Sequence, residues 1–194
     1  MKTKLLALLF IPIMLTGCFG GDGSESGGEQ VSVEPGKVMY DAGAYSIIYP
    51  EDWEVIETAD FTSNVPMQTL VGFRSNIKNE IFSANVNVVR GNVEEGLSSK
   101  DYGKSSLINA QKSLISFEEL GKENINFTVN DAEIETYIAK FQGQQSASDP
   151  MITFRQLYLV SNSIGYVVTA AYEANEDESI VNATYEMLKS FRIY

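Results

Sequence analysis

Apolar and polar residues alternate along several segments of the chain, and this period of two constrains the fold more than any other feature. In residues 45–49 the side chains of Tyr45, Ile47 and Tyr49 share one face, and Pro50 ends the run. Residues 82–89 repeat the pattern most regularly, with apolar side chains on one face and polar side chains on the other. Such alternation is typical of a half-buried β-strand, so both segments are predicted strands.

Further strands are predicted from Trp53 and Val55 onward, in residues 69–74, and in two hairpins. The first hairpin joins residues 124–129 to residues 133–141 through a turn at Asn130 and Asp131. The second joins residues 152–160 to residues 166–172, and residues 142–150 are predicted to form a polar loop between the hairpins. Because the connections within the hairpins are short, we expect antiparallel pairing.

Two segments have helical rather than strand periodicity. The first begins at Ser98, which has capping-box spacing to Asp101, and carries an apolar stripe of Leu107, Ala110, Leu114 and Phe117. Gly103 is expected to weaken its first turns. The second begins near Asn175 and closes the chain. Strands, a helix, more strands and a final helix predict one α+β domain over residues 38–194.

The first 18 residues have the pattern of a bacterial lipoprotein signal peptide. Lys2 and Lys4 precede an apolar run that is too short to span a bilayer, and the run ends in Leu-Thr-Gly-Cys at residues 15–18. We therefore predict that the peptide bond between Gly17 and Cys18 is cleaved, which removes residues 1–17. The Cys18 thiol is predicted to receive a diacylglyceryl group. The alternative interpretation is an ordinary cleaved signal peptide followed by an unrelated cysteine.

The next segment is rich in glycine, serine and acidic residues. Residues 19–36 contain six glycines and too few apolar residues to bury a core, so residues 18–37 are predicted to be a flexible tether after the lipidated cysteine. The domain would then be held at a membrane, facing outward on the periplasmic or extracellular side. Phe19 is not the aspartate that favours retention at the inner membrane, so an outer-membrane location stays open for a Gram-negative cell.

Charge and composition exclude several classes of function. The formal net charge is −12, and removal of Lys2 and Lys4 would leave 12 basic against 26 acidic residues. Such a surface repels phosphates, so we expect no nucleic-acid partner. The chain has no histidine, which excludes Ser-His and Cys-His nucleophiles and imidazole metal sites. We therefore expect no catalytic residue, no cofactor and no metal.

Two short motifs resemble ligand sites, but each has a simpler explanation. The last three residues of the phosphate-binding loop motif match Gly103, Lys104 and Ser105. That motif also needs a glycine at the position of Ser98, so we expect no nucleotide binding. Glu133 and Glu135 share one face of a predicted strand near Asp131 and could offer oxygens to a calcium ion. A solvated strand face is the commoner reason for such a pattern.

One loop was singled out as a contact surface. Residues 59–68 place Phe61, Val65 and Met67 among polar residues, and loops held by a rigid sheet often carry function. Trp53 could add a ligand platform to this surface. The alternatives are a connection without a function and a Trp53 side chain that belongs to the core.

The opening strand of the domain resembles that of the PsbP-like fold superfamily. The residues that carry the resemblance are the Tyr-Ser-Ile-Ile-Tyr-Pro-Glu-Asp-Trp run at residues 45–53, the Asn-Val-Asn-Val-Val strand at residues 85–89, and the end of the last helix at residues 187–191. The DcrB-like group of bacterial lipoproteins belongs to this superfamily. The resemblance implies a central antiparallel sheet flanked by helices and a non-catalytic binding or assembly role.

These observations lead to one expected function and two alternatives. We expect a membrane-anchored lipoprotein that binds a protein or complex of the cell envelope. The first alternative is a carboxylate-dependent hydrolase of envelope glycans, which needs two acids facing each other across a cleft. The second is a carrier of an apolar ligand, which needs a cavity between sheet and helices.

Overall fold

The computed structural model describes residues 28–61, 65–66, 68–77, 82–129 and 132–194. A seven-stranded sheet forms the centre of the molecule, in the order β4-β5-β6-β10-β9-β8-β7. Its strands are β4 (Glu54–Glu57), β5 (Thr69–Arg74), β6 (Asn85–Asn92), β7 (Ile115–Val129), β8 (Ala132–Gln144), β9 (Ile152–Ser161) and β10 (Ile164–Glu173). A short 3-10 helix, η1 (Thr58–Asp60), follows β4.

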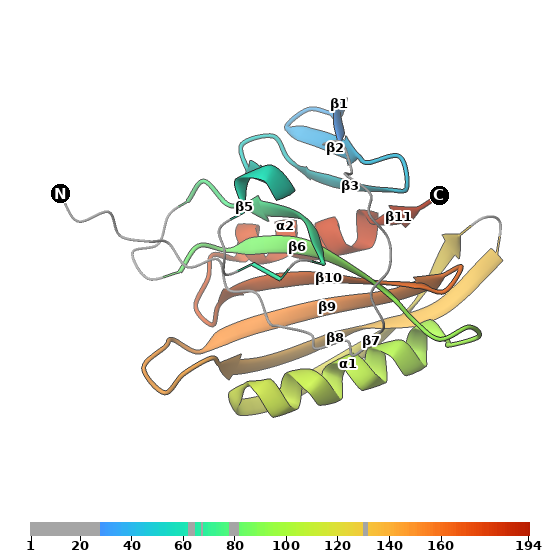
Figure 1. Ribbon diagram of the computed structural model, residues 1–194. Coiled ribbons are helices and arrows are strands. Elements are labelled where there is room, and N and C mark those ends of the chain that lie inside the picture. Colours follow the sequence, from blue (N-terminus) through green and yellow to red (C-terminus); the bar gives the residue numbers. More distant parts are fainter. Residues whose placement is uncertain (1–27, 62–64, 67, 78–81, 130–131) are drawn as a thin grey trace.

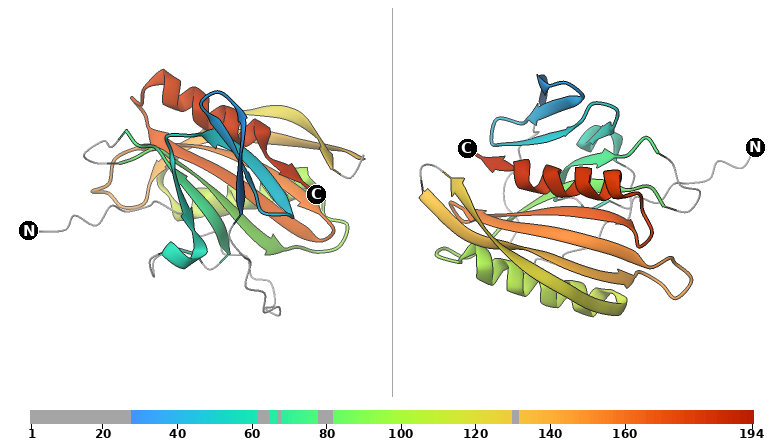
Figure 2. Two further views of the ribbon diagram at one scale, coloured as in Figure 1. Left: turned by 90° about the horizontal axis from the view of Figure 1, so that it is seen from above. Right: turned by 180° about the vertical axis from the view of Figure 1, so that it is seen from behind.

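A smaller sheet and two helices complete the fold. The smaller sheet has the order β1-β2-β3-β11, from β1 (Glu29–Glu34), β2 (Lys37–Asp41), β3 (Tyr45–Pro50) and β11 (Arg192–Ile193). Helix α1 (Ser99–Ser113) covers one face of the large sheet, and helix α2 (Glu178–Ser190) lies with the smaller sheet on the other (Figures 1 and 2). All pairings among the described strands are antiparallel, which confirms the predicted α+β class.

Each face of the large sheet has its own core. The larger core lies between this sheet, α2 and the smaller sheet, and it includes Ile47, Phe73, Leu157 and Phe191, all without exposed surface. The second core lies under α1 and includes Phe141, Phe154 and Tyr158. Since both faces are covered, β6 is buried on both sides, and the predicted polar face with Asn85 and Asn87 is not solvated.

Helix α1 begins where the sequence predicts it to begin. The Ser98 side chain accepts a hydrogen bond from the Asp101 amide, with a donor–acceptor distance of 3.0 Å. Gly103 lies inside this helix and is buried, so residues 103–105 form no phosphate-binding loop. The predicted apolar stripe is too long, because the helix ends at Ser113 and Phe117 belongs to β7.

The N-terminal boundary of the folded region differs from the prediction. Residues 29–34 form β1, which pairs with β2, although the sequence predicts an unstructured tether up to residue 37. The Tyr49 hydroxyl donates a hydrogen bond to Gln30 at 2.8 Å, and the Gly28 amide donates one to the Tyr40 hydroxyl at 3.0 Å. The folded body therefore begins about ten residues earlier than predicted, because backbone pairing compensates for the few apolar side chains.

Candidate functional site

The residues that the sequence singled out do not come together in one site. Gly17, Cys18 and Met67 lie outside the described residues, so the predicted lipidation of Cys18 stays a prediction. Trp53 is only 7% exposed and packs in the larger core, as its alternative interpretation predicts. Phe61 and Val65 are half-buried near η1. Trp53, the largest side chain of the predicted contact surface, therefore belongs to the core and is not available for contact.

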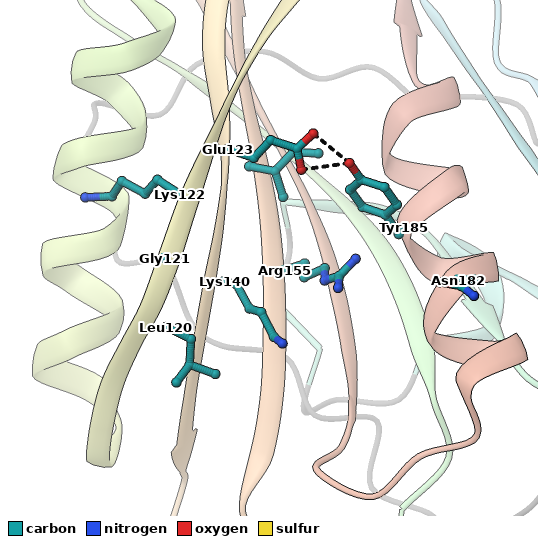
Figure 3. Close-up of a pocket in the computed structure, with 9 residues that line it drawn as sticks. Leu120, Gly121, Lys122, Glu123, Lys140, Arg155, Asn182 and Tyr185 are labelled. Carbon is teal, nitrogen blue, oxygen red and sulfur yellow. Dashed lines mark hydrogen bonds between the residues drawn. The ribbon is translucent and has the colours of Figure 1, made fainter.

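A groove lies instead between α2 and the edge of the large sheet. We call it the charged groove; its volume is about 410 Å3, and it is lined by Leu120, Gly121, Lys122, Glu123, Ile138, Lys140, Arg155, Asn182 and Tyr185. The strands β7, β8 and β9 form its floor, and α2 supplies Asn182 and Tyr185 as a wall (Figure 3). Helix α2 contacts β10 and β9 but leaves this part of β7 and β8 uncovered, which is why the groove exists.

Two cations face each other across the floor of the charged groove. Lys140 of β8 is directly opposite Arg155 of β9, so both side chains project from the same face of the sheet. Figure 3 shows both of them on the α2 side, whereas Lys122 points to the α1 side. On the other side of Lys140, the opposite residue in β7 is Gly121. Since Gly121 has no side chain, the Lys140 side chain stays open to the groove on that side.

In the part of the chain that the structure describes, no carboxylate forms an ion pair with Lys140 or Arg155, although Glu123 lines the same groove and accepts the Tyr185 hydroxyl. Ion pairs between described residues involve the cations Lys37, Arg74, Lys100, Lys122 and Lys189. Neither Lys140 nor Arg155 is among them. Like charges directly opposite each other destabilise a sheet, so this arrangement costs stability without a counter-ion.

Tyr185 organises the wall of the groove. Its hydroxyl donates to both carboxylate oxygens of Glu123, at 2.7 Å each, and this hydrogen bond is the main reason that its pKa rises to about 12. The guanidinium carbon of Arg155 lies 4.7 Å from the centre of the Tyr185 ring, and the ammonium of Lys189 lies 5.1 Å from it. Such cation–π contacts hold the guanidinium in one orientation.

Arg155 is also close to a second tyrosine, Tyr172 of β10. Burial raises the pKa of the Tyr172 hydroxyl, and the positive charge of Arg155 opposes this shift. Arg155 therefore interacts with two tyrosines, the ring of Tyr185 and the hydroxyl of Tyr172. No local sequence pattern indicates either cation, because only the register of β8 and β9 brings them together.

A second groove lies on the other side of α2, facing the smaller sheet. We call it the apolar groove; its volume is about 470 Å3. Ile48 and Pro50 of β3 and Ala183 and Met187 of α2 line it, together with Asn182, which also lines the charged groove. Its lysines Lys37 and Lys189 are paired with Glu34 and Glu186, at 2.9 and 3.7 Å. Both of its lysines are thus paired with carboxylates, whereas its arginine, Arg192, donates to the backbone carbonyls of Lys189 and Phe191.

The residues considered for calcium have other partners. Glu133 accepts a hydrogen bond from Asn126, and Glu135 pairs with Lys100 of α1 at 2.6 Å. The hydrogen bond and the charge of Lys100 lower the pKa of Glu135. Asp131 lies outside the described residues. Within the described ranges, no cluster of three or more aspartate, glutamate, histidine or cysteine side chains could hold a metal ion.

Comparison with solved structures supports one fold. Cyanobacterial PsbP (CyanoP) from Synechocystis sp. PCC 6803 superimposes with a TM-score of 0.52 over 92% of this chain and 99% of that chain, at 13% sequence identity. This chain has a PsbP-like fold. A mutant of the protein Mog1 superimposes with a TM-score of 0.51 over 87% of this chain and 96% of that chain, at 9% identity. No family model matches the sequence, and no curated protein matches it.

At identities this low, the likeness concerns the fold alone. The charged groove of this PsbP-like domain is therefore described by its own residues, and its function has to be argued from their chemistry. Among the described residues, no helix of the PsbP-like domain is long and apolar enough to cross a membrane.

Proposed function

We propose that this protein is a lipid-anchored binding module that works outside the cytoplasmic membrane, without catalytic activity, on a protein or complex of the cell envelope. The observation that carries the proposal is the lipoprotein signal pattern that ends at Cys18, ten residues before a compact PsbP-like body. A lipid on Cys18 would make the membrane surface the place of action. Two acyl chains make such an anchor stable, whereas one gives only marginal binding.

The length of chain after Cys18 limits how far the body could reach. Ten peptide links separate Cys18 from Gly28, the first described residue. A fully extended chain spans at most about 3.3–3.6 Å for each residue, so this segment would reach roughly 35 Å at most. This maximum length is shorter than that of a tether that runs from Cys18 to residue 37, as the sequence predicts. A partner should therefore be a protein at the membrane surface rather than one deep in the envelope.

The groove chemistry favours binding over hydrolysis. Glu123 is the one carboxylate among the residues that line the charged groove, and it accepts the Tyr185 hydroxyl. Hydrolysis of a glycan by two carboxylates needs a second acid about 5–10 Å away across the cleft. In the apolar groove, Glu34 and Glu186 are held by lysines. A binding role needs only the shape and charge that the grooves have.

Metabolic labelling with a palmitate analogue tests the anchor. The wild-type protein should be labelled and should fractionate with membranes, whereas Cys18→Ser should lose the label. Ser26→Ala, a change at a polar residue after the cysteine, serves as the matched control and should be labelled like the wild type. Equal labelling of the wild type and Cys18→Ser would contradict the proposal.

Photo-crosslinking in intact cells tests the partner. A crosslinking amino acid at Asn182, between the two grooves, should capture an envelope protein. The same amino acid at Lys104, an exposed position on α1 at the opposite face, should not. Capture of the same protein with equal yield from Lys104 would contradict a role for the grooves. Release of sugar from purified envelope glycan, lost in Glu123→Gln, would favour the hydrolase instead.

A further inference from the structure

We propose that the charged groove binds a small molecule through its carboxylate or phosphate group, and that Lys140 and Arg155 hold this anionic group. The inference rests on the proposed binding function, because it assigns a ligand class to one of the grooves. It does not depend on the lipid anchor, so the two proposals can fail separately.

The pair of cations without an ion-pair partner is the first argument. The chain has 26 acidic and 14 basic residues, so carboxylates for ion pairs are plentiful. Lys140 and Arg155 are nevertheless placed opposite each other at the floor of a groove, and neither forms an ion pair with Glu123, the carboxylate that lines the groove with them. Local arrangements that lower stability are expected at functional sites, where a bound ligand can provide the missing opposite charge. An anion between the two side chains would turn their repulsion into two attractive contacts.

The fixed orientation of Arg155 is the second argument. Its guanidinium lies over the Tyr185 ring, and Tyr185 is itself held by Glu123. A guanidinium fixed in this way loses little conformational freedom when it binds two oxygens of a carboxylate or phosphate. Lys140 supplies a mobile point charge opposite, and Gly121 leaves the approach open. The arrangement is that of a site prepared for an oxyanion.

Charge and size indicate that the occupant is small. A body with a net charge of −12 repels polyanions such as nucleic acids and anionic membranes, and two cations do not overcome this field. A volume of about 410 Å3 falls in the range of small-molecule sites. Leu120, with 42% of its surface exposed, and Ile138 add an apolar part to the lining. We therefore expect an anionic group attached to a short apolar portion.

The test uses a soluble chain of residues 28–194. This chain contains the complete described core, because all the described core residues lie between Val38 and Ile193. Backbone amide NMR signals are followed during titration with sodium phosphate and, in a second arm, with sodium hexanoate and sodium acetate. Sodium chloride keeps the ionic strength constant, because exposed charges respond to salt. We expect saturable shifts at residues 121, 140 and 155. Phosphate binding alone would assign a phosphate ligand, and tighter binding of hexanoate than of acetate would assign an apolar carboxylate.

Lys140→Gln is the decisive variant, and Lys104→Gln is the matched control on α1. Lys140→Gln should weaken binding at least about fivefold and leave the melting temperature unchanged or higher, because the repulsion from Arg155 is removed. Lys104→Gln should bind like the wild type. Phosphate or hexanoate, whichever binds, should raise the melting temperature of the wild type more than that of Lys140→Gln.

Three outcomes would overturn the inference. Shifts that do not saturate, or that are the same in both variants, would mean an adventitious ion only. A lower melting temperature of Lys140→Gln with unchanged binding would mean that Lys140 has a structural role. Failure of all anions to bind, while Cys18 is labelled and Asn182 captures a partner, would remove the ligand class and leave the proposed function in place.

Discussion

Gly103 of α1 lies against the ring of Tyr158 in β9: a Cβ atom at Gly103 would be 2.6 Å from Cδ2 of Tyr158 and 2.8 Å from the Tyr137 hydroxyl. The glycine lets the helix approach the sheet at this point. Both tyrosines are buried, and their rings are 5.4 Å apart. The helix–sheet distance in the second core is thus set by a residue that the sequence marked as a weak point of the helix.

Gly103→Ala should therefore destabilise the protein, although alanine favours a helix over glycine by about 1 kcal/mol. Overpacking of a well-packed core costs about 1–3 kcal/mol, and both neighbours are rings without room to retreat. Ser105→Ala, at an exposed position two residues on, is the control and should be neutral or slightly stabilising. Urea unfolding of both variants measures the difference, and a more stable Gly103→Ala would refute the packing argument.

The pKa of Tyr185 should depend on Glu123. In the wild type it is raised to about 12, mainly by the hydrogen bond to the Glu123 carboxylate. Glu123→Gln should lower the pKa of Tyr185 toward its ordinary value near 10. Glu186 also raises this pKa, but less, so Glu186→Gln should cause a smaller decrease. Carbon-13 NMR of the Tyr185 Cζ atom during a pH titration measures both, and equal shifts would contradict the assignment.

The same hydrogen bond predicts a dependence of stability on pH at the alkaline end. Because the folded state holds the Tyr185 proton more tightly than the unfolded state, its contribution is complete below about pH 10. It is lost as the pH rises from about 10 to about 12. The unfolding free energy should fall less over this range in Tyr185→Phe than in the wild type. Chemical unfolding at several pH values provides the measurement, and parallel curves would disprove the linkage.

Strand β1 should contribute to stability rather than act as a tether. A chain that starts at Val38 loses the β1–β2 pairing, the Gln30–Tyr49 hydrogen bond and the Gly28–Tyr40 hydrogen bond. At about 1 kcal/mol net for each hydrogen bond, the loss of the two side-chain hydrogen bonds alone predicts a decrease of about 2 kcal/mol relative to a chain that starts at Gly28, and the loss of the β1–β2 pairing adds to it. Thermal unfolding compares the two. Identical melting temperatures would support the flexible tether that the sequence predicts.

Asp177 caps α2 and should make the helix sensitive to acid. Hydrogen bonds from the Ser179 hydroxyl and amide lower the pKa of the Asp177 carboxyl in the folded protein. Its stabilising contribution is complete above the unfolded pKa of about 4 and is lost as the pH falls through the lower folded value. Asp177→Asn keeps a capping side chain and should reduce this acid dependence, whereas Asp177→Ala should also be less stable at pH 7. Unfolding curves at pH 3 and 7 separate the two effects.

Local patterns were enough to predict most of the strands and both helices. Residues 69–74 form β5 with the predicted bounds, and the two hairpins pair as expected. The errors arose where tertiary contacts overrode a local pattern. The glycines and acids around β1 predict a tether, whereas the strand is stabilised by pairing with β2. The polar residues Asn85 and Asn87 of β6 predict a solvated face, whereas both are buried in the folded protein.

The charged groove could not be predicted, for a physical reason. Lys140 and Arg155 are fifteen positions apart in the sequence, and a shift of one residue in the pairing of β8 with β9 would place them on opposite faces. The groove also depends on which part of the sheet α2 leaves uncovered, which no local pattern encodes. The predicted contact surface rested only on the apolar residues of one loop and on Trp53. In the folded protein Trp53 packs in the core.

Helix α2 is a shared wall, since Asn182 lines the groove on either side of it. An occupant of one groove that shifts this helix changes the shape of the other. By thermodynamic reciprocity, a small ligand that strengthened the grip on a partner would itself be held more tightly when the partner is present, by the same factor. Under the proposed function, a dissolved anion would therefore regulate how tightly the protein binds its partner, without any chemical reaction taking place.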